Sequence, residues 1–303
     1  MQLRRFLLLP VLLFVFAQQL HAQVKVEIGY QRRLFVLYEP IPITVAITNL
    51  TGRDLILTDT DTEKWFSFQV TTGDGRIVPP MDINYKIAGL RVPTGATVKH
   101  SVNLCAMYAV QDIGVYRIKA SIYSQQAKQY YSSAKDELEV TEAKTFWTQT
   151  VGVPENAAVK GTHRTISLLT FRQPKYNVLY VRVEDKDSNT IYATTSLGPL
   201  IASTEPDFKL DKSNTLHVLQ LVGARTFLYS RVNLNGACDQ VNYYSVNSQP
   251  RLKKDTEGEV YVSGGQLDSP DGSPTTASGP GASAPATGPK ISDRPPGFSP
   301  SGQ

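Results

Sequence analysis

The sequence predicts an all-β protein of two tandem β-sandwich domains followed by a disordered tail rich in Pro, Ser and Gly. Short alternating apolar segments recur at the spacing of sandwich strands, and no apolar series keeps helical spacing beyond two turns. The C-terminal end has few large apolar side chains. We therefore expect domains at 23–142 and 143–251, and the tail at 252–303.

The first domain shows strand and turn signals in regular succession. Residues 41–47 alternate along Ile-Pro-Ile-Thr-Val-Ala-Ile, as a strand with one buried face does, and residues 49–52 (Asn-Leu-Thr-Gly) form a turn. Residues 73–75 (Gly-Asp-Gly) give a second turn. The strands expected here are 24–28, 41–47, 55–57, 65–70, 76–78, 98–104, 115–122 and 137–140.

The second domain repeats this pattern after a junction at Phe146-Trp147 and the loop 153–158. Residues 185–189 are one turn signal. Asn235-Gly236 is another and suits a two-residue type I′ hairpin turn, because both residues tolerate positive φ. The strands expected here are 165–171, 178–183, 190–194, 208–210, 216–221, 227–232 and 241–244.

The N-terminus has the layout of a secretory signal peptide over residues 1–22. Arg4 and Arg5 precede an apolar run at 6–16, and Ala22 is the small residue before the expected cut. The run is much shorter than the roughly 20 residues of a membrane-spanning helix, although an uncleaved N-terminal anchor remains an alternative. We expect a mature protein that begins at Gln23, has no membrane span and lies in the periplasm or outside the cell.

The tail is predicted from its composition. From Ser263 to Gln303, 27 of the 41 residues are Gly, Pro, Ser or Thr. Such a segment buries too little apolar surface to offset the entropy lost on ordering it. We therefore expect it to be disordered.

Two parts of the first domain carry a family resemblance. Residues 38–49 (Tyr-Glu-Pro-Ile-Pro-Ile-Thr-Val-Ala-Ile-Thr-Asn) and 114–120 (Gly-Val-Tyr-Arg-Ile-Lys-Ala) resemble strands of bacterial immunoglobulin-like β-sandwich domains, with Tyr116 at the place of a tyrosine corner. The turn at 49–52, together with 66–78, is similar to the bacterial intracellular proteinase inhibitor family. This second resemblance implies the fold and an inhibitory loop, whereas the signal peptide departs from the family's intracellular setting.

Charge and motif content argue against several function classes. The formal net charge of +4 is spread along the chain, without the dense basic patch that nucleic acid requires. His100, His163 and His217 do not pair at metal-ligand spacing, and we expect them to be structural or exposed. No nucleophile elbow, phosphate loop or dinucleotide fingerprint occurs, so we expect no cofactor. A catalytic set that assembles only in space remains an alternative.

Two acidic turns could attract a hard cation. Residues 59–63 (Asp-Thr-Asp-Thr-Glu) and 185–189 (Asp-Lys-Asp-Ser-Asn) place oxygens at alternate positions. Lys64 and Thr190 stand where a calcium-binding loop needs glycine. We therefore expect solvated turns and no metal site.

The two cysteines lie one in each predicted domain. A disulfide between Cys105 and Cys238 would close a loop of more than 130 residues, worth about 4–5 kcal/mol by chain-entropy reasoning. The alternative is that each is a buried thiol.

Aromatic residues are the remaining candidates for a binding surface. Trp65, Trp147, Tyr131 and Tyr244 could stack on a sugar ring or contact a protein. Because neighbours in a strand face opposite sides, core packing is the alternative. We expect an exported, non-enzymatic binding or structural module with a protein or polysaccharide partner. The competing functions are a proteinase inhibitor and an enzyme with a dispersed site.

Overall fold

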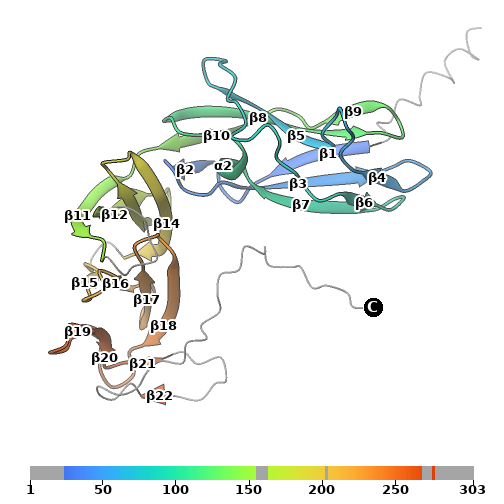
Figure 1. Cartoon of the computed structure of the whole chain (residues 1–303). Helices are drawn as coiled ribbons and strands as arrows, with labels where there is room; N and C mark the ends of the chain where they lie inside the picture. Colours follow the sequence, from blue (N-terminus) through green and yellow to red (C-terminus); the bar gives the residue numbers. More distant parts are fainter. Residues whose placement is uncertain (1–23, 155–162, 202–203, 268–274, 277–303) are drawn as a thin grey trace, which may run out of the picture. The chain divides into compact units, whose positions relative to one another are not determined.

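The computed structural model describes residues 24–154, 163–201, 204–267 and 275–276 (Figure 1). These residues are nearly all in strands and turns, so the predicted all-β fold is confirmed. The predicted signal peptide and residues 268–274 and 277–303 of the predicted tail lie outside the described residues.

The chain divides into two compact units. Unit 1 contains the described residues of Met1–Leu34, Ile41–Val110 and Gly114–Glu139, and unit 2 contains those of Phe35–Pro40, Gln111–Ile113 and Val140–Gln303. The main segment of unit 1 ends at Glu139 and that of unit 2 begins at Val140. The boundary predicted from the sequence was residue 142.

The first part of the chain forms three sheets. The first has the order β1-β3-β7, the second has the order β2-β10-β8-β5 with β9 beside β8, and the third is the pair β4-β6. Their bounds are β1 Val24–Gly29, β2 Leu34–Val36, β3 Pro42–Asn49, β4 Leu55–Leu57, β5 Phe66–Thr72, β6 Leu90–Val92, β7 Thr97–Asn103, β8 Gly114–Ser124, β9 Gln129–Ser132 and β10 Asp136–Thr141.

Alternation along β3 and β8 explains why these segments bury one face. Ile43, Val45 and Ile47 are fully buried in β3, while the residues between them are half-buried. Tyr116 is 1% exposed at the start of the alternating series in β8. Two sheets that each bury one face give the predicted sandwich-like arrangement.

Two local predictions for this part of the chain are wrong. Residues 76–78 form no strand, and Ile77 makes only an isolated bridge to Thr71. The strand predicted to reach residue 104 ends at Asn103, whose side chain accepts a hydrogen bond from the Cys105 N–H at 3.2 Å and caps the short helix α2 (Leu104–Met107). No helix in the described part of the chain is long and apolar enough to cross a membrane.

Unit 2 contains two large antiparallel sheets and a hairpin. The first sheet has the order β11-β12-β13-β14, the second has the order β15-β16-β17-β18-β21-β22, and β19 pairs with β20. Their bounds are β11 Lys144–Gly152, β12 His163–Arg172, β13 Asn177–Asp185, β14 Thr190–Leu200, β15 Asp207–Leu210, β16 Leu216–Leu221, β17 Thr226–Val232, β18 Cys238–Tyr244, β19 Arg251–Lys254, β20 Val260–Ser263, β21 Gln266–Leu267 and β22 Thr275–Thr276.

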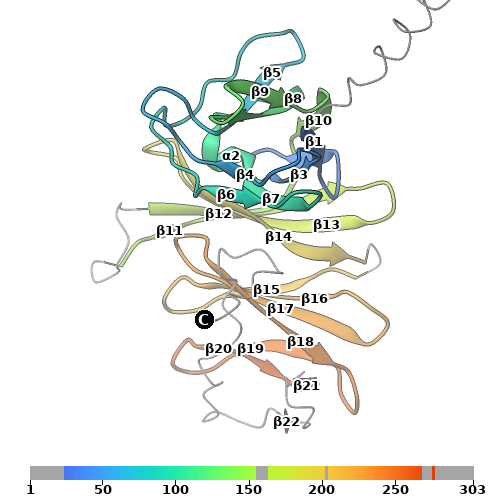
Figure 2. The same ribbon diagram turned by 90° about the vertical axis from the view of Figure 1, so that its right-hand side faces the viewer.

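The β15–β18 sheet carries an apolar cluster on each face. In Figure 2 this sheet lies between the β11–β14 sheet and the β19–β20 hairpin. On one face, Leu216 and Val218 join a cluster with the β11–β14 sheet. On the other face, Leu219 and Tyr229 join a second cluster with hairpin residues, including Leu252. Unit 2 therefore has three layers, and β16 is buried on both sides.

The third layer overturns part of the tail prediction. Leu252, Val260 and Val262 are 4–8% exposed and belong to the second apolar cluster. Residues 252–267 therefore form strands and the turns between them rather than a disordered tail. The prediction was wrong because it was made from the average composition of the C-terminal end, which is rich in Gly, Pro and Ser. Two strands of only four residues each do not change that average much.

The turn between β17 and β18 also differs from the prediction. Asn233 N–H donates to Ala237 O at 3.0 Å, so three residues connect the strands instead of two. Gly236 has φ +78°, whereas Asn235 does not adopt positive φ. This pattern is that of a three-residue hairpin loop with glycine at its last position.

Candidate functional site

The predicted aromatic surface does not form as a unit. Trp65 is fully buried, and its Nε1–H donates to Ile87 O at 3.1 Å, so its prediction as a binding residue is wrong. Its ring lies in a core cluster with Phe66, at a centroid distance of 5.4 Å. Trp65 therefore packs in the core, which was the alternative to a binding role that strand alternation allowed.

The other three aromatic candidates lie in separate places. Tyr131 in β9 is half-buried and accepts a hydrogen bond from the Gln129 side chain. Trp147 in β11 is half-buried against Phe208, with ring centroids 5.1 Å apart. Tyr244, at the end of β18, is 38% exposed. Their role in partner binding stays a prediction.

The candidate disulfide is not formed. Cys105 lies in α2 and Cys238 in β18, and neither is in a disulfide bond. Cys238 packs against the cluster between the two large sheets. Burial, together with the nearby Asp239 charge, raises the pKa of its thiol to about 11. Cys238 is therefore an unreactive thiol at neutral pH.

In both acidic turns the first aspartate is bound by groups of the protein itself. Asp59 accepts from the Trp65 N–H at 3.0 Å and pairs with Lys64 at 3.3 Å. Asp185 accepts from the Asp187 N–H at 3.0 Å and pairs with the fully buried Arg164 at 3.5 Å. Among the described residues, no three metal-ligating side chains converge.

The second large sheet of unit 2 carries a row of polar side chains. His217 in β16 lies directly opposite Arg231 in β17, and Arg231 lies opposite Asp239 in β18. Lys209 in β15 stands opposite His217 and extends the row. Residues directly opposite one another point to the same face, so four strands contribute to one polar strip. This face is the one covered by the β19–β20 hairpin.

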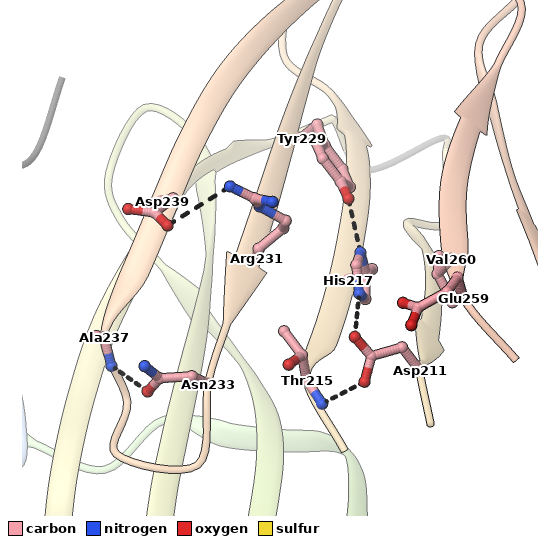
Figure 3. A pocket seen from close by; sticks show the side chains of 10 residues that line it. All are labelled: Asp211, Thr215, His217, Tyr229, Arg231, Asn233, Ala237, Asp239, Glu259 and Val260. Atoms are coloured by element: carbon pink, nitrogen blue, oxygen red, sulfur yellow. Dashed lines mark hydrogen bonds and ion pairs between the residues drawn. The ribbon is translucent and has the colours of Figure 1, made fainter. Parts of the chain in front are cut away.

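A chain of hydrogen bonds fixes His217 at the base of a pocket (Figure 3). His217 Nδ1 lies 2.6 Å from the Tyr229 hydroxyl oxygen, and Nε2 lies 3.1 Å from Asp211 Oδ2. The other oxygen of Asp211 accepts from the N–H groups of Ser213 and Thr215 at 2.8 and 2.9 Å. A neutral ring that donates from Nε2 and accepts at Nδ1 satisfies every group.

Burial keeps this chain uncharged at its centre. Desolvation lowers the pKa of His217, against the opposing effect of Asp211, and Arg231 lowers it further. Desolvation also raises the pKa of Tyr229 well above its usual range. His217 and Tyr229 are therefore both neutral near pH 7, and together with Asp211 they form a rigid floor.

Charged side chains form the rim of the pocket. Arg231 and Asp239 are 50% and 66% exposed, and their closest charged atoms are 3.7 Å apart. Glu259, from the hairpin, pairs with Lys212 at 2.9 Å. In Figure 3, Arg231 and Glu259 lie on opposite sides of His217. The pocket has a volume of about 360 Å³ and is also lined by Thr215, Asn233, Ala237 and Val260.

The hairpin that bears Glu259 is held by polar contacts as well as by its apolar face. Leu252 N–H donates to Asp207 Oδ2 at 2.8 Å, and Lys212 N–H donates to Gly258 O at 3.0 Å. Both contacts join the hairpin to the strand β15 or to the loop after it. The wall of the pocket is therefore fixed to its floor.

Only part of this site could be predicted from the sequence. His217 was recognised in an alternating strand and interpreted as structural, while Asp211, Tyr229, Arg231 and Glu259 were missed. One signal could have indicated the site: the polar residues at 217, 231 and 239 share a sheet face with the apolar Leu219 and Val241, so a polar strip crosses an otherwise apolar face. Finding it requires the strand register, which the sequence did not supply.

Comparison with known proteins does not assign a family. No family model matches the chain, and no curated protein matches its sequence. Among solved structures, the chain is distantly similar to the sporulation control protein Spo0M from Bacillus subtilis, at 9% identity and a TM-score of 0.27. That match covers 74% of this chain and 91% of the Spo0M chain. A similarity this low carries no argument about function.

Proposed function

We propose that this protein is an exported binding module whose unit 2 takes up a small polar molecule in the pocket above His217. One observation carries the proposal: the neutral side chains of His217 and Tyr229, fixed by hydrogen bonds, lie beneath exposed charged groups of both signs. A pocket of this size accommodates a small metabolite or one sugar ring. Fixed polar groups orient such a ligand without large entropic cost.

The same geometry argues for binding rather than catalysis. An Asp-His pair can activate a hydroxyl nucleophile, and Tyr229 stands at the position of that hydroxyl. However, its raised pKa keeps Tyr229 protonated, and only 9% of the residue is exposed. His217 has both ring nitrogens occupied. A dispersed catalytic site therefore has less support than a binding site.

A pocket-filling variant tests the binding function. Ala237 lines the pocket and is exposed, so Ala237→Trp adds volume there without removing a charge. We expect members of a panel of sugars, polyols, amino acids and hydroxy acids to raise the melting temperature of the wild-type protein. Ala237→Trp should lose that shift.

Ala224→Trp is the matched control, because Ala224 is also exposed in a hairpin turn but does not line the pocket. It should keep the shift. The proposal fails if no compound in the panel stabilises the wild-type protein, or if Ala237→Trp responds as the wild type does.

Proteinase inhibition is a second candidate, favoured by one loop of unit 1. Between β5 and β6, Ile77, Met81 and Ile83 are 77%, 60% and 78% exposed. The loop is anchored, because Met81 N–H donates to Met107 O at 2.8 Å and the Tyr85 hydroxyl donates to Phe66 O at 2.7 Å. An exposed apolar segment on a fixed backbone suits insertion into a proteinase cleft.

Inhibition assays against serine and cysteine proteinases test this candidate. We expect Met81→Asp and Ile83→Asp to abolish any inhibition. Leu50→Asp, at another exposed apolar position of unit 1, should retain it. Cleavage of the loop without inhibition would contradict the candidate function.

Export rests on the signal-peptide pattern of residues 1–22. We propose that the mature protein begins at Gln23 and resides in the periplasm or outside the cell. N-terminal sequencing of the protein from the exported fraction should find Gln23. A membrane-bound form that retains Met1 would instead favour the anchor.

A further inference from the structure

The charges around the pocket restrict the class of ligand. Among the charged residues that line the pocket, Arg231 is cationic and Asp211, Asp239 and Glu259 are anionic. Lys212 lies outside the lining but pairs with Glu259, and counting it leaves one excess negative charge. A purely anionic ligand adds to this excess, while a ligand with no net charge does not. The charge balance therefore disfavours a purely anionic ligand, and the choice between a cation and a zwitterion depends on whether Arg231 takes part in binding.

Arg231 supplies the strongest recognition group. Its guanidinium is 3.7 Å from Asp239, which is beyond hydrogen-bonding distance, and half of the side chain is exposed. A planar guanidinium binds a carboxylate through two parallel hydrogen bonds. The loose pair with Asp239 costs little to exchange, because exposed ion pairs contribute little stability.

Glu259 supplies the complementary group across the pocket. It projects from the hairpin on the side of His217 opposite Arg231 (Figure 3). Its Oε1 contacts Lys212, and the side chain is 46% exposed. A carboxylate in this position accepts hydrogen bonds from an ammonium group.

Resting on the binding function proposed above, we infer that the pocket binds a small zwitterion, with its carboxylate on Arg231 and its ammonium group facing Glu259. Amino acids are the simplest members of this class. The neutral His217–Tyr229 floor lies between the two charged groups and adds no net charge of its own.

Isothermal titration with matched probes tests the inference. The zwitterions are the α-amino acids and 4-aminobutyrate. The single-charge analogues are lactate, which lacks the ammonium group, and 1-amino-2-propanol, which lacks the carboxylate. Glucose represents neutral ligands. We expect at least one zwitterion to bind, and lactate and 1-amino-2-propanol to bind about 10-fold or more weakly, as for the loss of one charge-assisted hydrogen bond.

Variants then assign each charged group. Arg231→Gln and Glu259→Gln should each weaken zwitterion binding about 10-fold or more. Arg225→Gln and Glu257→Gln are the controls, because both residues are exposed, lie on the same hairpins and do not line the pocket. These two variants should bind as the wild type does.

Different results separate the two proposals. If glucose, lactate or 1-amino-2-propanol binds as well as any zwitterion, and Ala237→Trp abolishes that binding, the pocket is a binding site but the zwitterion inference is wrong. If zwitterions bind equally to Arg231→Gln and the wild type, the inference is also wrong. If no probe binds, both the zwitterion inference and the small-molecule function fail.

Discussion

Leu252→Ala is the sharpest test of the three-layer architecture of unit 2. Leu252 lies in β19, is 4% exposed and packs in the cluster between the hairpin and the second large sheet. In a disordered tail, the same substitution would leave stability unchanged. The variant therefore distinguishes the observed third layer from the tail that the sequence predicted.

The expected cost follows from burial. Removing a buried leucine side chain to alanine destabilises a protein by about 2–5 kcal/mol, through lost transfer free energy and the cavity left behind. For a unit of this size, a loss of about 3 kcal/mol lowers the melting temperature by roughly 6–12 °C. The hairpin consists of two four-residue strands, so partial collapse of the cavity should place the cost in the lower half of the range.

Urea denaturation followed by tryptophan fluorescence measures this loss, because Trp147 in β11 reports on unit 2. Lys253→Ala is the control, since Lys253 is exposed on the same strand. Lys253→Ala should change the unfolding free energy by less than about 0.5 kcal/mol. A Leu252→Ala variant that is as stable as Lys253→Ala would refute the third layer.

Three further outcomes are expected. Gly236→Ala should destabilise unit 2 in thermal unfolding, because Gly236 has φ +78° and an added Cβ would lie 2.3 Å from Ala193 Cβ. An unchanged unfolding midpoint would contradict the turn geometry. Cys238 should resist iodoacetamide at pH 8 in the native protein and react after unfolding, because a pKa of about 11 leaves roughly one thiolate per thousand thiols. Rapid labelling of the native protein would contradict the burial of Cys238. Burial lowers the pKa of His217 in the folded state, so when the pH falls below the ordinary histidine pKa of about 6.5 the unfolded state takes up the proton first. Unit 2 should therefore lose stability from pH 7 to pH 5.5. His217→Gln should flatten this pH dependence in unfolding titrations, and an unchanged slope would contradict the reasoning.

The local fold was predictable where one strand face is buried. The segments 41–47 and 115–122 alternate in the sequence, and they form β3 and β8 with the expected buried faces. β16 is different: Leu-His-Val-Leu-Gln-Leu is buried on both faces, because two layers cover it. Alternation identifies a strand but does not count the layers packed against it.

The site was less predictable because it depends on register. A two-residue turn at Asn235-Gly236 would place Arg231 opposite Gln240, whereas the observed three-residue loop places it opposite Asp239. A shift of one residue changes which side chains meet across the strands and which face they share. Asp211 and Glu259 are also brought to His217 by contacts distant in sequence, which spacing alone does not reveal.

The order in which the layers are synthesised gives unit 2 a vulnerable period. The strands β16, β17 and β18 leave the ribosome before the hairpin at 251–263 that covers them. Until the hairpin arrives, Leu219, Phe227 and Tyr243 form an uncovered apolar sheet face. Such a surface adheres to chaperones or to other nascent chains. A chain that terminates between β18 and β19 therefore retains this adhesive face permanently.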